Sequence, residues 1–337
     1  MTPLDPVRAA SALLSQIGLP APLSVSSLPG GRNNYVWAVK SASRKLLLKR
    51  YFWSEQDPRD RMGQEWAFLA YLRQIGCRRG PEPLARDPDT RCALLEFIEG
   101  KPIEIQDVTH ADVEAAADFF AEINQDKSRA ISLQPVSEAC FTLGDHVAAV
   151  AHRMQRLRSI EASDASHAKA RELVSATLEP LWRTIENDIR SQEESPLGAV
   201  LPTAERCLSP SDFGFHNALR QHDGSLRFLD FEYAGWDDPA KTMIDFCNQP
   251  DGLLPRALAD MFRKRTIGTA ANDLAARIRL LEPLYQLKWA CICLNNFLPG
   301  RSFAGAPPGR SPTDQLTRAA TMADRASTSR MRRLSPV

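Results

Sequence analysis

The alternation of apolar and polar residues predicts short strands in the first hundred residues and mainly helices in the rest of the chain. Two runs rich in β-forming residues, Tyr35–Val39 and Leu46–Lys49, flank a polar turn and predict a β-hairpin. Apolar side chains recur at helical spacing between Gly63 and Gly76, and the second glycine is a typical helix stop. The apolar run Cys92–Ile98 predicts another strand, which ends at a glycine.

Residues 101–200 have a helical pattern that polar turns interrupt. It predicts three helices, at Ala111–Ile123, Asp145–Leu157 and His167–Arg190. Further along, Leu219 and the mostly apolar run Leu226–Leu229 lie on either side of an Asp-Gly turn at Asp223. Such a turn between two short runs predicts a second hairpin.

The C-terminal third again favours helices. Asp238 is a typical N-cap and Pro239 a typical first helical residue, so they begin a predicted helix at Ala240–Cys247. The apolar stretch Leu281–Leu298 predicts a buried helix. The end of the chain is expected to contain a linker, a short helix and a mobile basic tail, at Gly300–Pro312, Thr313–Arg325 and Ser327–Val337.

Composition is that of an ordinary globular protein. Of the 337 residues, 43% are hydrophobic and 25% charged, which argues against disordered and fibrous classes. The length exceeds what one hydrophobic core usually supports, so we expect two lobes. The sequence has neither an N-terminal signal pattern nor an apolar run long enough for a bilayer, so we expect a cytoplasmic protein without a membrane partner.

Charge and cysteine usage exclude some classes of binding partner and of metal site. The net charge is +1, but residues 101–200 contain 17 acidic against 10 basic residues, a local charge of −7. Such a region either attracts a cationic ligand or forms a solvated helical surface. The basic C-terminus lacks interleaved aromatic residues, so no nucleic-acid partner is expected. Seven cysteines without CxxC spacing predict reduced, buried thiols and no zinc site.

The strongest chemical signal lies between residues 208 and 246. Asp212 begins a DxxxxN pattern that ends at Asn217, and the second predicted hairpin brings Asn217 near Asp230, the first residue of an Asp-Phe-Glu sequence. Phosphoryl transfer requires a carboxylate that orients the acceptor hydroxyl, together with oxygen ligands for Mg²⁺. A DxxxxN pattern alone also occurs in caps and turns, so its surroundings must support this interpretation.

The N-terminal third contains a second signal of the same chemistry. Gly30, Gly31 and Asn34 lie in a loop before the first predicted strand, and glycine allows backbone N–H groups to approach a phosphate closely. Lys49 projects from an apolar strand, so its burial requires an acidic partner or a phosphate. Glu65, on the following predicted helix, is the candidate partner, although it also fits an exposed acidic position.

In this order, the glycine loop, the lysine, the glutamate, DxxxxN and Asp-Phe-Glu resemble the aminoglycoside phosphotransferase and choline kinase family, the small-molecule branch of the protein-kinase-like fold. The resemblance covers about residues 28–298. It implies a bilobal α+β fold, with a small antiparallel-sheet N-lobe and a larger, mainly helical C-lobe. The implied parts are a nucleotide-binding lobe at 1–99 with a hinge near 96–100, a C-terminal lobe at 100–300, and a linker and tail at 301–337.

The resemblance also implies residue roles. Asp212 is the expected catalytic aspartate, and Asn217 and Asp230 are the expected Mg²⁺ ligands. Lys49, positioned by Glu65, is expected to bind the phosphates of ATP. Further nucleotide contacts are expected from the glycine loop and the hinge backbone, at Gly30, Gly31, Asn34, Glu96 and Ile98. Weaker candidates for acceptor binding, each also explained by packing or capping, are Glu232, Trp236, Lys288, Trp289 and Asn295.

One departure from the family pattern lies at Pro210, where a histidine usually stands two residues before the catalytic aspartate. That histidine mainly supports the loop, so its absence alters the expected local geometry more than the chemistry. The departure leaves open a catalytically silent pseudokinase that acts as a binding module. Protein kinase activity is disfavoured, because no stretch that ends in Ala-Pro-Glu follows Asp230.

The predicted function is therefore ATP- and Mg²⁺-dependent transfer of a phosphoryl group to a hydroxyl of a small molecule. An aminoglycoside, an amino alcohol such as choline or ethanolamine, and a sugar all remain possible acceptors. The pattern does not discriminate ATP from GTP.

Overall fold

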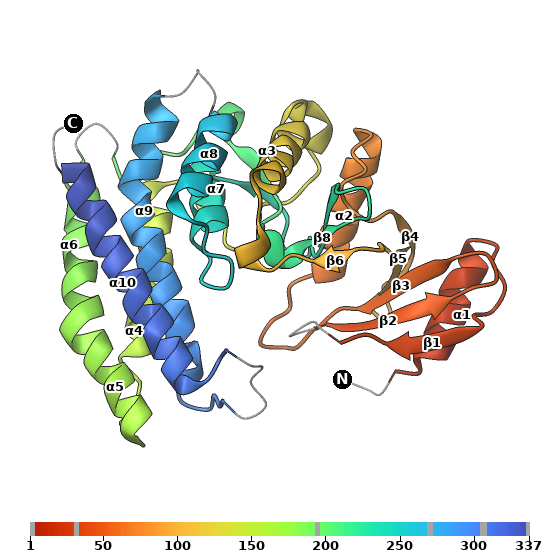
Figure 1. Ribbon diagram of the computed structural model, residues 1–337, viewed down its shortest axis with the longest axis horizontal. Coiled ribbons are helices and arrows are strands. Elements are labelled where there is room, and N and C mark those ends of the chain that lie inside the picture. Colours follow the sequence, from red (N-terminus) through yellow and green to blue (C-terminus); the bar gives the residue numbers. More distant parts are fainter. Residues whose placement is uncertain (1–3, 30–33, 193–195, 268–271, 304–308, 335–337) are drawn as a thin grey trace. The chain divides into compact units, whose positions relative to one another are not determined.

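The computed structural model describes residues 4–29, 34–192, 196–267, 272–303 and 309–334 (Figure 1). The chain forms two compact units, and each combines two separate segments. The first unit contains Met1–Ser137 and Leu208–Trp236, and the second contains Glu138–Cys207 and Asp237–Val337. The lobe boundary expected near residue 99 stays a prediction.

A five-stranded antiparallel sheet with the order β1-β2-β3-β5-β4 begins the first unit (Figure 1). Its strands are β1 (Ser24–Ser27), β2 (Tyr35–Lys40), β3 (Lys45–Arg50), β4 (Pro83–Asp87) and β5 (Cys92–Glu96). The first predicted hairpin is β2 and β3, paired in register from Tyr35 opposite Arg50 to Lys40 opposite Lys45. Both hairpin strands and the predicted strand at Cys92 are thereby confirmed.

Helix α1 (Pro6–Gln16), which we did not predict, packs against this sheet. Its start signal is present in the sequence, because Asp5 caps the helix by accepting from the N–H groups of Val7 and Arg8. The buried residues of α1 form one apolar cluster with those of the sheet, and the cluster includes Leu13, Leu14, Leu46, Leu48 and Leu94.

The described part of the first unit also contains two further α-helices and a small three-stranded sheet. Helix α2 (Arg61–Gln74) agrees with the predicted helix, and Gly76 beyond it has a φ of +77°, a conformation that favours glycine. Helix α3 (His110–Asn124) begins with a capping box between Thr109 and Asp112. The second predicted hairpin is β8 (Ala218–Arg220) and β9 (Leu226–Phe228), to which β6 (Lys101–Pro102) adds a third strand. Short 3₁₀ helices lie at Ile105–Asp107, Lys127–Ala130 and Phe215–Asn217.

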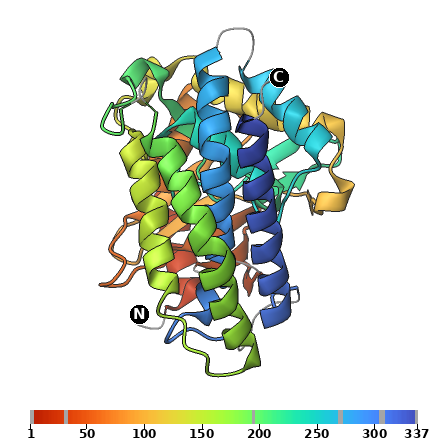
Figure 2. The same ribbon diagram turned by 90° about the vertical axis from the view of Figure 1, so that its left-hand side faces the viewer.

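The second unit is mainly helical. Its helices are α4 (Leu143–Leu157), α5 (Ala165–Leu173), α6 (Glu179–Arg190), α7 (Pro239–Asn248), α8 (Arg256–Ile267), α9 (Asn272–Cys293) and α10 (Pro312–Leu334). Figure 2 shows α4, α6, α9 and α10 side by side, and α9 contacts each of the other three. The short strands β7 (Cys207–Ser209) and β10 (Gly235–Asp237) pair where the chain passes between the units, and 3₁₀ helices lie at Thr203–Glu205 and Leu294–Phe297.

Three predictions for this unit differ from the structure, two of them helices and one the C-terminal tail. The helix expected at His167–Arg190 is divided into α5 and α6 by a π-helical segment at Val174–Leu178. Helix α9 begins at Asn272 instead of Leu281 and continues through Pro283. The expected mobile tail after residue 326 was wrong for residues 327–334, which belong to α10. Arg330 and Arg333 both form ion pairs with Asp188 of α6, at 2.6 and 3.2 Å, and thereby hold the end of α10.

Within the described ranges, none of the helices combines the length and the apolar character that a bilayer crossing needs.

All seven cysteines are free and buried, as the sequence predicts. Burial raises the pKa of the Cys77 thiol to about 12 and that of Cys140 to about 11. The thiolate is the nucleophile, so we expect iodoacetamide at pH 8 to leave the native protein unmodified over minutes and to modify seven thiols after denaturation. Mass spectrometry of intact protein measures both states. Rapid alkylation of a native thiol would contradict the burial described here.

Candidate functional site

Lys49 lies at the centre of a buried cluster of charges in the first unit. Its Nζ donates to Oε2 of Glu65 at 2.7 Å and to Oδ1 of Asp230 at 2.6 Å. The three residues come from β3, from α2 and from the segment after β9. The lysine side chain is 6% exposed, the glutamate 1% and the aspartate 39%. The expected pair of Lys49 and Glu65 is therefore present, and only Asp230 keeps a substantial exposed surface.

The electrostatics of this cluster keep Lys49 charged. Burial alone would lower the pKa of its ammonium group, but the charges of Asp230 and Glu65 outweigh burial and raise that pKa well above its usual range. A permanent positive charge at this position is suited to binding phosphate oxygens.

Glu65 also holds the Asp-Phe-Glu sequence through the backbone. Its Oε1 accepts a hydrogen bond of 3.0 Å from the N–H of Phe231. The ring of Phe231 packs against Phe68 of α2, with ring centroids 5.0 Å apart. Asp230 has a φ of +63°, which is uncommon outside glycine, and these two contacts of the next residue stabilise it.

The DxxxxN segment forms a compact loop beside β9. Nδ2 of Asn217 donates to the backbone oxygen of Asp212 at 2.9 Å and to its Oδ2 at 3.2 Å. The backbone oxygen of Asn217 accepts from the N–H of Leu229 at 2.8 Å, one residue before Asp230. Nε2 of His216 lies 3.3 Å from Oδ1 of Asp212, whose side chain is 45% exposed. The hairpin therefore brings the DxxxxN loop and Asp230 together, as the sequence predicts.

Asn124, at the end of α3, supports this loop and was missed in the sequence. Its Oδ1 accepts from the N–H of Leu208 at 2.8 Å, and its Nδ2 donates to the oxygen of Leu208 at 3.0 Å. Ser209 adds a second support, because its Oγ accepts from the N–H of Ser211 at 3.0 Å. A single asparagine at the end of a helix has no distinctive sequence signal.

The residues present fit Mg²⁺ bound together with a nucleotide. In the described part of the chain, no three His, Cys, Asp or Glu side chains gather as a complete metal site. Mg²⁺ usually takes only one or two carboxylates and completes its shell with phosphate oxygens and water. Asp230 and Asn217 are oxygen donors of this kind, and their roles as metal ligands stay predictions.

Asn34 and Glu232 form a second buried polar cluster next to Asp230. Nδ2 of Asn34 donates to Oε2 of Glu232 at 2.5 Å, and its Oδ1 accepts from the N–H of Phe52 at 2.9 Å. Nε of Arg61 lies 3.6 Å from Oε1 of Glu232. Burial and the charge of Asp230 raise the pKa of Glu232, and Lys49 opposes them. Gly30 and Gly31, the other expected loop residues, lie outside the described residues.

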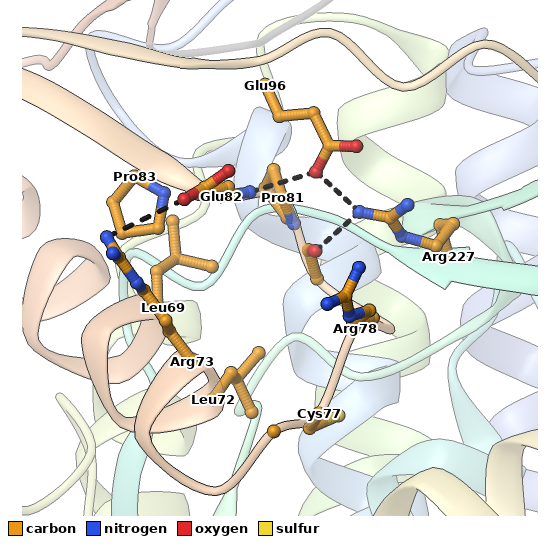
Figure 3. Close-up of a pocket in the computed structure, with 12 residues that line it drawn as sticks. Leu69, Leu72, Arg73, Cys77, Arg78, Pro81, Glu82, Pro83, Glu96 and Arg227 are labelled. Atoms are coloured by element: carbon orange, nitrogen blue, oxygen red, sulfur yellow. Dashed lines mark hydrogen bonds and ion pairs between the residues drawn. The ribbon is translucent and has the colours of Figure 1, made fainter. Parts of the chain in front are cut away.

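At the expected hinge, the side chain of Glu96 points into a cavity of about 310 Å³ (Figure 3). Its Oε2 accepts from Arg227 at 2.7 Å and from the N–H of Glu82 at 3.1 Å. The N–H of Glu96 donates to the oxygen of Glu82 at 2.9 Å, so that donor is already used. Ile98 is buried. A purine contact at Glu96 and Ile98 stays a prediction.

The order of these residues agrees with a known family. A family model described as "Phosphotransferase enzyme family" matches residues 24–272. The chain belongs to the phosphotransferase enzyme family. Among curated protein sequences, none matches it.

Solved structures share the fold at low sequence identity. Spectinomycin phosphotransferase, APH(9)-Ia, in complex with ADP and spectinomycin, has a TM-score of 0.65 and 11% identity over 97% of this chain and 99% of that chain. A choline/ethanolamine kinase family protein from Mesorhizobium loti has a TM-score of 0.60 and 17% identity over 98% of this chain and 96% of that chain. A choline kinase from Cryptosporidium parvum has a TM-score of 0.59 and 12% identity over 92% of this chain and 89% of that chain. These likenesses confirm the predicted kinase-like α+β fold.

The weaker acceptor candidates of this phosphotransferase-family chain are engaged in contacts within their own units. In the first unit, Nε1 of Trp236 donates to the oxygen of Ala130 at 3.1 Å. In the second, Asp245 of α7 accepts from Nζ of Lys288 at 2.6 and 2.7 Å and from Nε1 of Trp289 at 2.9 Å. Asn295 lies half-buried in the 3₁₀ helix after α9. Substrate contact by these residues stays a prediction.

Strand β3 offers a matched test of the buried cluster, because Lys45 pairs with Glu99 at 3.1 Å on the surface. We expect Glu65→Gln to lower the free energy of unfolding by about 3 kcal/mol, since it leaves buried charges without their partner. Glu99→Gln is expected to change it by less than about 1 kcal/mol, because both members of the Lys45–Glu99 pair are solvated. Urea unfolding measures both variants. Equal losses of unfolding free energy in the two variants would show that the buried pair stabilises the protein no more than the surface pair does.

Proposed function

We propose that this protein transfers the γ-phosphoryl group of ATP, with Mg²⁺, to a hydroxyl of a small molecule. The observation that supports this most strongly is the meeting of Lys49, Glu65 and Asp230 beside the loop that carries Asp212 and Asn217. Phosphoryl transfer depends mainly on positioning and on compensation of charge. This one constellation supplies a fixed cation, metal-ligand oxygens and a carboxylate that is almost half exposed.

Asp212 is the proposed catalytic residue. One of its carboxylate oxygens accepts from Asn217, and the other lies near His216. These contacts restrict the rotamer of a side chain that stays almost half exposed. A carboxylate held in this way orients the acceptor hydroxyl and accepts its proton.

Lys49 is proposed to neutralise charge on the phosphates. In the structure its Nζ is shared between Glu65 and Asp230. Glu65 keeps it in place from the buried side, whereas phosphate oxygens compete with Asp230 on the exposed side. Mg²⁺, when bound through Asp230 and Asn217, supplies further compensation of the developing negative charge.

The acceptor is a small hydroxyl compound, and its class is left open. Structures similar to this chain are named for spectinomycin and kanamycin on one side and for choline and ethanolamine on the other. Exposed carboxylates at Asp237 and Asp238, which follow Trp236, would favour a cationic acceptor. Asp237 pairs with Lys241, however, and Asp238 pairs with Arg277, so the charges of both are already neutralised. A neutral sugar therefore remains as reasonable as an amino alcohol or an aminoglycoside.

Asp212→Asn tests the reaction, with Asp223→Asn, in the turn between β8 and β9, as the matched control. We expect Mg²⁺-dependent ADP release to be stimulated by one class in a panel of aminoglycosides, amino alcohols, sugars and nucleosides. In Asp212→Asn that turnover should fall by about 10²- to 10⁴-fold, with nucleotide affinity nearly unchanged. The control should keep full turnover.

Unchanged turnover in Asp212→Asn would show that Asp212 has no catalytic role. Nucleotide binding without stimulation by any acceptor would indicate an acceptor outside the panel. If the wild-type protein bound no nucleotide, the evidence would favour the pseudokinase.

Asp230→Asn tests the metal role separately. Asparagine is chosen because it tolerates the positive φ at this position better than alanine does. We expect its affinity for ATP to fall at least about tenfold with Mg²⁺ and to change little with EDTA, because the lost charge acts through the metal. Titration calorimetry in the two buffers measures this difference. An equal loss in both buffers would contradict a metal-specific role.

A further inference from the structure

A second cavity of about 410 Å³ lies in the first unit, beside the start of α2. We call it the arginine pocket, because Arg59, Arg61, Arg86 and Arg91 line it. Its other walls include Tyr51, Phe52 and Trp53, which follow β3. None of the proposed catalytic, phosphate-binding or metal-binding side chains lines it. Its volume lies in the range of small-molecule sites, which is about 300–1,000 Å³.

Two of the four arginines already have an acidic partner. Arg59 and Arg61 each donate to Asp57 at 2.6 Å. These guanidinium groups lower the pKa of Asp57 to about 2, so it stays ionised at neutral pH. Asp60, the acidic residue in the lining, accepts from the N–H of Gly63 at 2.8 Å as the cap of α2.

The other two arginines have aromatic partners instead. The guanidinium of Arg86 lies over the ring of Trp66 at 4.9 Å, and that of Arg91 lies over Trp53 at 4.4 Å. Among the described residues, neither of them makes an ion pair with a carboxylate. Stacking on a ring restricts a guanidinium and leaves its N–H edge available. The pocket therefore offers two positioned cations without matching anions.

The cavity at the expected hinge differs from the arginine pocket in how its arginines are paired. Arg227 there is paired with Glu96 at 2.7 Å, and Arg73 lies 3.6 Å from Glu82 (Figure 3). Two of the three arginines that line it are thus paired within the protein, and Arg78 is the third. The same arginine chemistry in the arginine pocket is left unbalanced on Arg86 and Arg91, which selects for an anionic occupant.

We propose that the arginine pocket binds a phosphate-bearing small molecule at a site separate from that of the reacting nucleotide. The planar guanidinium edge matches phosphate oxygens in a bidentate manner. The ring of Trp53 and its aromatic neighbours suit the organic part of such a ligand. A free phosphate ester, rather than a macromolecule, fits a cavity of this size.

An occupant of this pocket contacts residues that hold the candidate active site. Arg61 donates to the hydroxyl of Tyr233 at 3.0 Å and lies near Glu232, the last residue of Asp-Phe-Glu. It also donates to the backbone oxygen of Phe52 at 2.9 Å, next to Tyr51. The ring of Tyr51 lies 4.9 Å from Nζ of Lys49. Binding in the pocket is therefore connected through Tyr51 to Lys49 and through Arg61 to Glu232.

Phenyl phosphate is the probe, because it combines a phosphate ester with one aromatic ring. It is titrated by calorimetry into the full-length protein saturated with ADP, so that the nucleotide site does not compete. We expect one site, with an affinity that Arg86→Gln/Arg91→Gln weakens at least about tenfold. Arg8→Gln/Arg44→Gln removes two charges from exposed positions of the same unit and is expected to leave binding unchanged.

Thermal unfolding and ADP affinity of both double variants establish that they are folded. Absence of phenyl phosphate binding to the wild-type protein would overturn the proposal, and so would equal weakening in the two double variants. Equally strong binding of phenol would show that the phosphate is not recognised, which also overturns it. These outcomes do not depend on turnover, so failure of the proposed phosphotransferase activity is distinguished from failure of this site.

Discussion

The burial of Lys49 is the physical constraint on which the first unit depends. An ammonium group loses several kcal/mol of hydration when it leaves water, and only well-placed anions offset this loss. Those anions come from Glu65 on α2 and from Asp230, which are 16 and 181 residues away along the chain. The sheet, the helix and the hairpin must therefore be correctly assembled before the charge is compensated. Correct folding and formation of the proposed phosphate-binding site therefore depend on the same contacts.

An apolar layer next to these charges holds them in place. Phe119 of α3 stacks on Phe228 of β9 with ring centroids 4.6 Å apart, and Phe231 lies between α3 and Phe68 of α2. Gly80 belongs to the same layer, because a Cβ there would lie 2.6 Å from a methyl group of Leu72 and 3.2 Å from the ring of Phe231. Close packing leaves little room for the Asp-Phe-Glu backbone to move. The unusual backbone conformation of Asp230 is thus maintained from both its polar and its apolar side.

The sequence was informative where a residue's role depends on local pattern. The hairpin strands around Lys49 and the turn at Asp223 follow from alternation and from turn chemistry, so the meeting of Asn217 with the segment before Asp230 could be predicted. Contacts between distant segments could not be predicted where the residues that make them belong to no recognisable motif. Nothing near Asn124 or Arg61 distinguishes them in the sequence, because their roles depend on what the fold places opposite them. The tail was mispredicted for the same reason, since its arginines find a carboxylate on α6.

The loop that carries Asp212 is where the sequence departs from its family, and its contacts reduce the weight of that departure. Asn124, the last residue of α3, donates to and accepts from the backbone of Leu208. It therefore fixes β7, the strand that leads into the loop. Ser211 adopts a φ of +68°, and the hydroxyl of Ser209 binds its N–H. Strained backbone of this kind persists only where surrounding contacts determine it. The support expected from a histidine at position 210 is thus provided by other side chains, and the carboxylate of Asp212 keeps an ordered, accessible position. This favours an active phosphotransferase over a silent binding module.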